Sequence, residues 1–179
     1  MLDRYSPDVI EKAKKIKLVI FDVDGVLTDG RIICDNKGNE IKNFDVNDGF
    51  GITLLKRAGI KCVILTAAGT PLVTRRAKVL KIDKVYQKCH YKIEAYKKVK
   101  KKFKVNNEEI CFIGDDLIDI PLLKRVGLAI CPRNAMPEVK DFAHYVSEKD
   151  GGRGAVREIC DLILKVQGVW KKVTSRYFE

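Results

Sequence analysis

The most informative segment of the sequence is residues 17–25 (KLVIFDVDG), in which an apolar run ends in two aspartates. Residues 17–21 are partly β-branched and show no polar alternation, which is typical of a strand covered on both faces. Two carboxylates directly beyond a buried strand, Asp22 and Asp24, are costly unless something binds between them. Because Asp and Gly are also ordinary turn residues, this segment alone fits a turn as well as a functional site.

Similar apolar runs alternate with amphipathic stretches along the rest of the chain. Strands are predicted at 61–66, 84–86, 109–114, 128–131 and 145–146, and helices at 51–57, 71–80, 92–103, 117–126, 137–142 and 154–166. This alternation predicts a single α/β domain over residues 1–179 with a doubly wound, mostly parallel Rossmann-like sheet. Residues 30–45 are instead predicted to form a β-hairpin inserted after the first strand.

The composition of the 179 residues excludes several classes of protein. Hydrophobic residues make up 46% and charged residues 33%, which is enough to bury a core. No apolar stretch approaches the ~18–20 residues of a membrane span, and the N-terminus lacks the apolar core of a signal peptide. The six cysteines form no Cys-x-x-Cys pair and indicate reduced thiols. We therefore expect a cytoplasmic protein without a membrane partner.

The formal charge of +11 raises the question of nucleic-acid binding. Six lysines lie within residues 97–104, interleaved with apolar residues at helical spacing, which is typical of a solvated helix face. The sequence carries no zinc knuckle, arginine-rich tail or aromatic stacking motif. We therefore expect no nucleic-acid partner, and a positive field also suits small anionic substrates.

A second acidic segment, residues 115–119 (DDLID), follows the predicted strand at 109–114 and opens a helix. Helix capping explains one of its acids, because carboxylates suit the positive end of the helix dipole. The others, together with Asp22 and Asp24, form the kind of oxygen-rich set that Mg²⁺ prefers. Ligands bind beyond the carboxyl ends of the strands in such sheets, so we expect a magnesium site there.

Two further residues at strand ends complete a candidate phosphate site. Thr66 ends the strand at 61–66, and Lys92 opens the lysine-rich helix. Each is ordinary alone, as a strand-end hydroxyl and as one of many lysines. Beside a metal-binding acid cluster, however, a hydroxyl and an ammonium can bind the oxygens of a phosphate ester.

Residues 21–30 (FDVDGVLTDG) resemble the first motif of the haloacid dehalogenase superfamily of phosphohydrolases. Thr66, Lys92 and residues 114–119 (GDDLID) fall where the second, third and fourth motifs belong. The hairpin and the segments 47–52 (NDGFGI) and 151–158 (GGRGAVRE) are similar to one branch. That branch holds the 3-deoxy-D-manno-octulosonate (Kdo) 8-phosphate phosphatases and the related nonulosonate 9-phosphate phosphatases. The similarity covers about residues 16–168.

The resemblance implies an Mg²⁺-dependent phosphomonoester hydrolase that acts through an aspartyl-phosphate. It implies that Asp22 is the nucleophile and that Asp24 is the general acid and then the general base. Asp22, the Asp24 carbonyl and Asp115 would hold Mg²⁺, while Thr66 and Lys92 would bind the phosphoryl group. The residues that it implies for substrate binding are Asp48, Gly49, Asp116, Asp119 and Arg153. Of these, Asp116 and Asp119 would either bind Mg²⁺ through water or orient Lys92.

The chain is too short to hold the cap domain that encloses the site in many members of this superfamily, so we expect an uncapped fold. The resembling branch forms homotetramers in which the hairpins build a central barrel. The apolar residues of this hairpin (Ile32, Ile33, Ile41, Phe44) fit an edge that needs a partner, although the hairpin could also fold onto its own domain. The tail at 169–179 is expected to fray or, by the resemblance, to cover a neighbour's site.

Two positions depart from the branch and leave the substrate open. Asn47 stands where a basic residue usually precedes the Asp-Gly pair, and Ala67-Ala68 replaces the usual Gly-Arg after Thr66. Both changes remove positive charge that a keto-acid carboxylate would need. The candidates are Kdo 8-phosphate, a nonulosonate 9-phosphate or a neutral sugar phosphate.

Two functions of other classes also stay open. One is a non-catalytic oligomerisation domain of the same fold, although the acids and the lysine of the motifs are all present. The other is a receiver-type signalling domain, whose phosphoacceptor aspartate would end the third strand, where this chain has Tyr86-Gln87.

Overall fold

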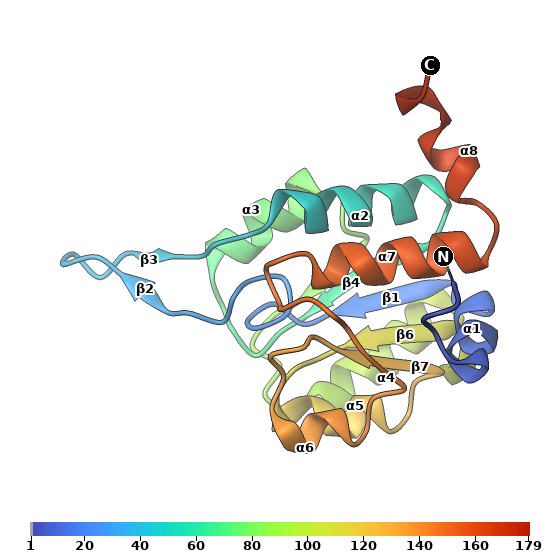
Figure 1. The fold of residues 1–179 in the computed structure, drawn as a ribbon. Coiled ribbons are helices and arrows are strands. Elements are labelled where there is room, and N and C mark those ends of the chain that lie inside the picture. Colours follow the sequence, from blue (N-terminus) through green and yellow to red (C-terminus); the bar gives the residue numbers. More distant parts are fainter. Residues whose placement is uncertain (1) are drawn as a thin grey trace.

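The computed structural model describes residues 2–179, and its main element is a six-stranded sheet in the order β5-β4-β1-β6-β7-β8. The strands are β1 Leu18–Phe21, β4 Lys61–Leu65, β5 Lys84–Tyr86, β6 Ile110–Ile113, β7 Leu128–Cys131 and β8 Tyr145–Val146. Every pairing between them is parallel. The predicted doubly wound α/β architecture is confirmed, with a sheet that is wholly parallel (Figure 1).

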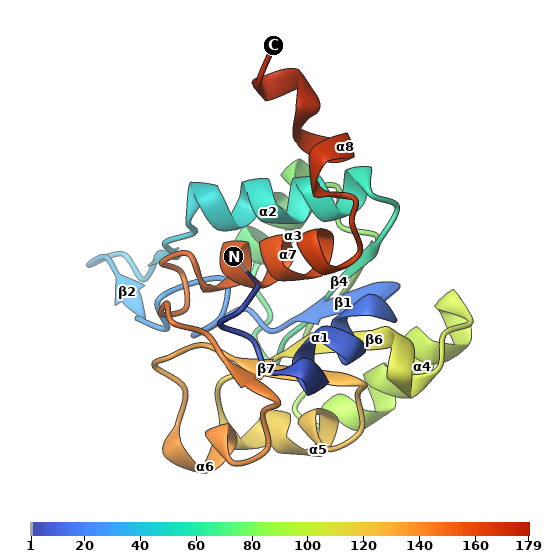
Figure 2. The same ribbon diagram turned by 45° about the vertical axis from the view of Figure 1, so that its right-hand side comes forward.

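Helices cover both faces of this sheet (Figures 1 and 2). One face is covered by α1 Pro7–Lys14, α2 Val46–Arg57, α3 Pro71–Val79 and α7 Ala155–Val166. The other is covered by α4 Lys92–Phe103, α5 Ile120–Leu123 and α6 Pro137–Lys140. In β1, Val19 and Phe21 pack under the first group of helices, whereas Leu18 and Ile20 pack under the second. Both faces of the strand are buried, which explains its lack of polar alternation.

Three helical segments differ from the prediction. The α2 helix begins at Val46 rather than at 51, because Asp45 caps it by accepting from the N–H groups of Asn47 and Asp48. The helix expected at 117–126 is a 3₁₀ turn, Leu117–Asp119, followed by the short α5, in which Pro121 restarts the helix. The α1 helix was not predicted. The lysines at 97, 98, 101 and 102 in α4 and Lys104 directly after it are exposed, as expected for a solvated face.

The predicted hairpin is present, but its strands are short: β2 is Ile33–Cys34 and β3 is Glu40–Ile41. It projects from the side toward which the strands of the sheet point (Figure 1). The tail forms α8, Trp170–Thr174, and a 3₁₀ turn, Ser175–Tyr177, at the other end of the molecule. The tail therefore lies away from the carboxyl ends of its own sheet. Among residues 2–179, no helix combines the length and the apolarity needed to cross a membrane.

Asp48 joins α2 to α7 through a buried carboxylate. Only 1% of the residue is exposed, and its side chain accepts from the N–H groups of Gly154 at 3.4 Å and Arg157 at 2.7 Å. These donors lie at the start of α7, where N–H groups have no partner within the helix. Burial raises the pKa of Asp48 to about 6, although the N–H group of Arg157 lowers it. Asp48 thus caps a helix that lies more than a hundred residues away in the sequence.

We expect Asp48→Ala to lower the free energy of unfolding by about 1–3 kcal/mol, because it leaves buried N–H groups of α7 unpaired. Urea unfolding followed by circular dichroism measures this change. The control is Asp141→Ala at an exposed position, which should change the free energy by less than about 0.5 kcal/mol. Equal unfolding midpoints for wild type and Asp48→Ala would contradict the capping role.

Candidate active site

The loops that follow the three central strands, β4, β1 and β6, meet at a hollow of about 210 Å³. Its lining consists of Asp22, Asp24, Gly25, Gly30, Thr66, Ala67, Ala68, Asp115, Asp116 and Ile118. Residues far apart in the sequence meet here because β1 pairs with β4 on one side and with β6 on the other. The hollow lies at the carboxyl ends of the strands, where the sequence places the candidate site.

The loop after β1 is held in a tight turn that brings it close to the loop after β6. Gly25 has a φ of +82°, and a Cβ on this residue would lie 1.9 Å from Oδ2 of Asp115. Only glycine allows this conformation and this approach together. The glycine-rich segment 151–154 supports the loop from behind, because the N–H group of Gly152 donates to the Val26 carbonyl at 2.9 Å.

Lys92 carries a charge although only 2% of the residue is exposed. Its Nζ lies 3.0 Å from Oδ2 of Asp22 and 2.5 Å from Oδ1 of Asp119. Burial lowers the pKa of Lys92, but the two carboxylates outweigh this effect and leave the pKa raised. The ammonium group is therefore charged and held between two acids.

Asp119 is completely buried and has two sets of contacts. One oxygen binds Lys92, and the other accepts from the N–H groups of Asp115 at 2.9 Å and Asp116 at 3.3 Å. Asp119 therefore orients Lys92 and fixes the loop that carries Asp115, which is one of the two roles considered from the sequence. Asp116 is exposed at the edge of the hollow and caps the 3₁₀ turn through the N–H group of Leu117.

Asp22, Asp115 and Asp119 form an acid cluster, with one carboxylate oxygen of each within 4.8 Å of the others. Burial raises the pKa of Asp22 to about 7, against the effect of Lys92. Burial and the charges of Asp22 and Asp119 raise the pKa of Asp115 to about 8. Oδ1 of Asp22 and Oδ1 of Asp115 are buried without a hydrogen-bond partner among residues 2–179. A cluster of acids in which two members carry buried, unpartnered oxygens fits a hard divalent cation.

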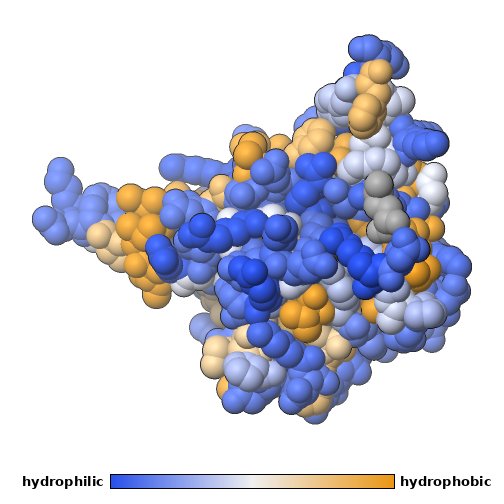
Figure 3. Space-filling model, viewed as in Figure 1, coloured by the Kyte–Doolittle hydropathy of each residue, from blue (hydrophilic) through white to orange (hydrophobic). Residues whose placement is uncertain are grey.

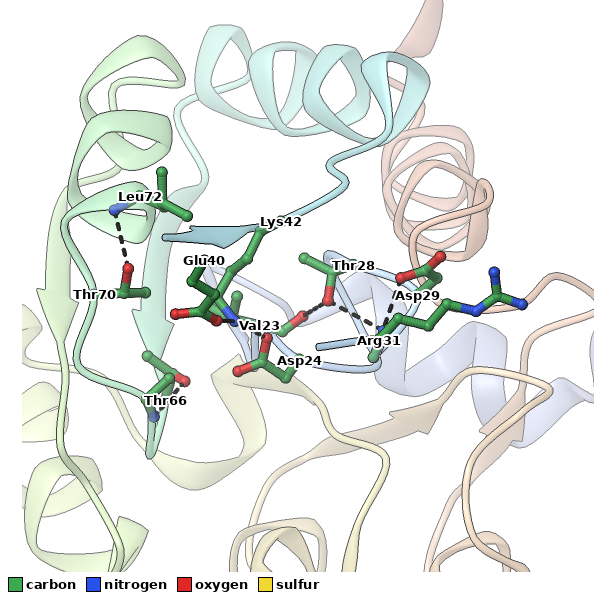
Figure 4. A network of polar contacts seen from close by, with 12 residues as sticks. Val23, Asp24, Thr28, Asp29, Arg31, Glu40, Lys42, Thr66, Thr70 and Leu72 are labelled. Carbon is green, nitrogen blue, oxygen red and sulfur yellow. Dashed lines mark hydrogen bonds and ion pairs between the residues drawn. The ribbon is translucent and has the colours of Figure 1, made fainter. Parts of the chain in front are cut away.

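Two further polar side chains, Thr66 and Asp24, line the hollow. The Thr66 residue is 1% exposed, and its Oγ1 accepts from the N–H group of Ala68 at 3.1 Å, which leaves its proton free to be donated. Oδ1 of Asp24 accepts from Nζ of Lys42 at 2.6 Å (Figure 4). Lys42 comes from the hairpin and also lies 2.8 Å from Glu40. Lys42 was not predicted, because nothing in its sequence pattern distinguishes it from the many other lysines.

The predicted substrate-binding residues divide into two groups. Asp116 lines the hollow and Asp119 lies directly behind it, whereas Asp48, Gly49 and Arg153 do not line it. Asp48 caps α7, and a Cβ on Gly49 would lie 2.3 Å from Nη2 of Arg76. The side chain of Arg153 is 62% exposed and lies 4.0 Å from Asp29. Within one chain, these three residues therefore contribute to packing and to the surface around the site.

Comparison with known proteins agrees with this geometry. A family model described as haloacid dehalogenase-like hydrolase matches residues 72–159. The 3-deoxy-D-manno-octulosonate 8-phosphate phosphatase of Yersinia pestis is 44% identical over 166 residues, which cover 91% of this chain and 89% of that protein. The chain belongs to the haloacid dehalogenase-like hydrolases. The phosphatase of the same name from Escherichia coli K12 is 44% identical over 163 residues, which cover 91% of this chain and 87% of that protein.

Solved structures of haloacid dehalogenase-like proteins extend the comparison to three dimensions. The 3-deoxy-D-manno-octulosonate 8-phosphate phosphatase from Moraxella catarrhalis was crystallised with magnesium, phosphate and Kdo. It is 38% identical, with a TM-score of 0.94, over 97% of this chain and 99% of that chain. The resemblance expected from the four motifs is therefore confirmed, together with the fold that it implies.

The acid cluster predicts an unusual dependence of stability on pH. Native Asp22 and Asp115 have pKa values above those of unfolded carboxyl groups, so the native state binds more protons than the unfolded state. Without metal, the free energy of unfolding should therefore fall as the pH rises from about 4 to about 8. We expect Asp115→Asn to raise it by at least about 1 kcal/mol at pH 8, with a smaller gain at lower pH.

Thermal unfolding in EDTA and in Mg²⁺, at pH 5 and pH 8, measures both effects. Mg²⁺ should stabilise the wild type at pH 8 and should stabilise Asp115→Asn much less, because the variant lacks a ligand oxygen with full charge. Asp141→Asn, at an exposed position, should behave as the wild type. If Asp115→Asn is less stable than the wild type in EDTA at pH 8, the unfavourable burial of charge assigned to this cluster is wrong.

Proposed function

We propose that this protein is an Mg²⁺-dependent phosphomonoester hydrolase that acts on a sugar-acid phosphate such as Kdo 8-phosphate. The observation that carries the proposal is the pair of buried, unpartnered oxygens on Asp22 and Asp115 beside the charged Lys92. The names of the relatives from Yersinia pestis and Escherichia coli support the same substrate. The Moraxella catarrhalis structure, with its magnesium, phosphate and Kdo, supports the same cofactor.

The proposed reaction begins with attack by a carboxylate oxygen of Asp22 on phosphorus. The new P–O bond forms as the bond to the sugar oxygen breaks, and Asp24 donates its proton to the departing oxygen. Water then attacks the phosphorus of the aspartyl-phosphate and gives a proton to Asp24, which releases inorganic phosphate and restores Asp22. Lys92 keeps the nucleophile in place through its 3.0 Å contact, and Thr66 donates to a phosphoryl oxygen.

The residues that would hold Mg²⁺ are Asp22, Asp115 and the backbone carbonyl of Asp24. Four aspartates line the hollow, and a phosphate dianion is repelled by such a surface. The bound ion supplies the positive charge that offsets this repulsion and stabilises charge on the phosphoryl oxygens. This requirement explains why the fold tolerates raised carboxyl pKa values at Asp22 and Asp115.

We expect Asp22→Asn to lose at least about a thousandfold in kcat with every phosphomonoester, because the amide is a poor nucleophile. Phosphate release with Mg²⁺ measures this loss, and circular dichroism confirms that the variant folds. Asp141→Asn serves as the matched control, with kcat within about twofold of the wild type. Near-normal turnover by Asp22→Asn would overturn the assignment of the nucleophile. A wild type inactive on every ester would favour a non-catalytic domain.

A neutral sugar phosphate is the second candidate substrate, and the lining of the hollow favours it. Among the residues that line the hollow, none is a lysine or arginine, and Ala67 and Ala68 occupy the wall after Thr66. The ammonium group of Lys92 is already bound to two acids. A substrate carboxylate would therefore depend on cations outside the hollow. Comparing kcat/KM for Kdo 8-phosphate, nonulosonate 9-phosphates and neutral sugar phosphates separates the two candidates.

We further propose that the chain is one cytoplasmic domain that assembles as a homotetramer through its hairpin. All six cysteines are free, which supports a reducing compartment. On the projecting hairpin, Ile32 is 82% and Ile41 50% exposed, and Figure 3 shows hydrophobic surface on this projection. Apolar side chains on a thin, exposed hairpin favour burial against other copies.

We expect the double variant Ile32→Asp/Ile41→Asp to have a smaller mass in solution than the wild type, because it places charges in the proposed interface. Light scattering after size-exclusion chromatography measures the mass. Val79→Asp, at a 72% exposed position on α3, is the control and should keep the wild-type mass. A monomeric wild type would contradict the tetramer.

A further inference from the structure

We propose that Lys42 is a positioning residue for Asp24, so that the hairpin is part of the catalytic machinery of its own chain. The inference rests on the proposed function, because it takes Asp24 as the group that donates and accepts protons. It extends that function by a residue outside the four sequence motifs. The contacts, burial and surroundings of Lys42 carry it.

Lys42 is unusual for a lysine on an exposed hairpin. Its side chain is 4% exposed, and its Nζ lies 2.6 Å from Oδ1 of Asp24 and 2.8 Å from Oε1 of Glu40. Removing an ammonium group from water is costly unless hydrogen-bonded negative groups replace the solvent. Figure 4 shows the Lys42 side chain extending from the hairpin toward Asp24, with Glu40 beside it. The side chain therefore turns back toward the hollow, whereas most hairpin residues face solvent.

The carboxylate of Asp24 is held by its contact with Lys42. The Asp24 side chain is 41% exposed, and Lys42 is the one side chain among residues 2–179 that binds its carboxylate. Lys42 holds Oδ1 and leaves Oδ2 without a hydrogen bond from the described residues, which suits an oxygen that exchanges protons. Without Lys42, the Asp24 side chain would be free to rotate toward solvent.

The arrangement around Asp24 repeats the arrangement around Asp22. In each, a lysine whose side chain is almost covered lies between a reactive carboxylate and a second acid that orients the lysine. Asp22 is held by Lys92, which Asp119 orients at 2.5 Å, and Asp24 is held by Lys42, which Glu40 orients at 2.8 Å. The second set differs because its lysine and its orienting acid both come from the hairpin.

The proposed reaction explains why Asp24 needs a fixed position. The same carboxyl group gives a proton to the leaving oxygen and later takes one from water, so it must return to one place in both steps. A displacement of about 1 Å at a reacting group can lower the rate about a hundredfold. We expect Lys42→Met, which keeps the apolar stem, to lower kcat about 10- to 100-fold with little change in KM.

The first test compares sugar phosphate with p-nitrophenyl phosphate, whose leaving group departs without a proton. If Lys42 acts through Asp24, Lys42→Met should keep a rapid first release of one nitrophenolate per site and then turn over slowly. Lys42→Arg should recover part of the lost kcat. Lys37→Met, at the exposed hairpin turn, is the matched control and should match the wild type. Loss of the rapid first release in Lys42→Met would overturn the proposal.

The second test is a double-mutant cycle, measured as the rate of that first release and of steady-state turnover. In an Asp24→Asn background, Lys42→Met should change turnover by less than about twofold, because its partner is already gone. A full repeat of the loss seen in the wild-type background would show that Lys42 acts elsewhere. Glu40→Gln, at a partly exposed position, should lower kcat severalfold and should also lose its effect beside Asp24→Asn.

Controls separate this inference from the function on which it rests. Inhibition by inorganic phosphate and the urea midpoint of Lys42→Met should match the wild type, which excludes a collapsed site. If Lys42→Met does not fold, Glu40→Gln and Lys42→Arg replace it in the same double-mutant cycle. An inactive wild type would overturn the proposed function, whereas an active wild type with an equally active Lys42→Met would overturn the role of Lys42 alone.

Discussion

The contact between Lys92 and its two acids, Asp22 and Asp119, is the interaction on which the site depends. Three carboxylates whose oxygens lie within 4.8 Å of one another repel each other strongly in a buried place. Lys92 offsets part of this repulsion. Asp119 binds Lys92 and also accepts a hydrogen bond from the N–H group of Asp115, so it links Lys92 to the backbone of the loop after β6. Lys92 nevertheless opens α4, where the helix dipole disfavours a cation, and the N-cap residue Tyr91 makes no side-chain capping hydrogen bond. Both burial and the helix dipole disfavour the charge of Lys92. This indicates that a lysine at this position serves chemistry more than stability.

The sheet was predictable because its strands are covered on both faces. Continuous apolar runs such as residues 128–131 indicate strands that are buried on both faces, so no choice between a buried and an exposed face is needed. The strand β7 has the predicted bounds. Strand ends then indicated Asp22, Thr66 and Asp115, because parallel strands bring their carboxyl ends to one edge. The start of α2 was missed because Gly49, a poor helix former, lies in its first turn. A Cβ on Gly51 would lie 3.1 Å from the Cα of Arg157, so α2 packs tightly against α7 at this glycine.

Contacts between distant segments could not be read from local pattern. Asp48 binds N–H groups that lie 106 and 109 residues further along the chain. The family resemblance implied a role for Asp48 in substrate binding, whereas in the fold Asp48 lies in α2 and caps the start of α7. Lys42 was missed for the opposite reason, because its local pattern is that of any solvated lysine. Hydrophobic periodicity indicates which face of a helix or strand is buried. It does not indicate which part of the domain the side chains of a hairpin contact.

The hairpin connects the two halves of the proposal, assembly and catalysis. Its strands β2 and β3 have two residues each, and a two-stranded hairpin of this size is only marginally stable alone. Lys42 directly follows β3, so the order of the hairpin determines how firmly Lys42 can hold Asp24. Packing of Ile32 and Ile41 against other copies would supply that order. An uncapped chain that assembles through this hairpin would then gain a better-placed acid as well as a more enclosed site. Assembly is in that case coupled to kcat through Lys42, in addition to any effect on substrate binding.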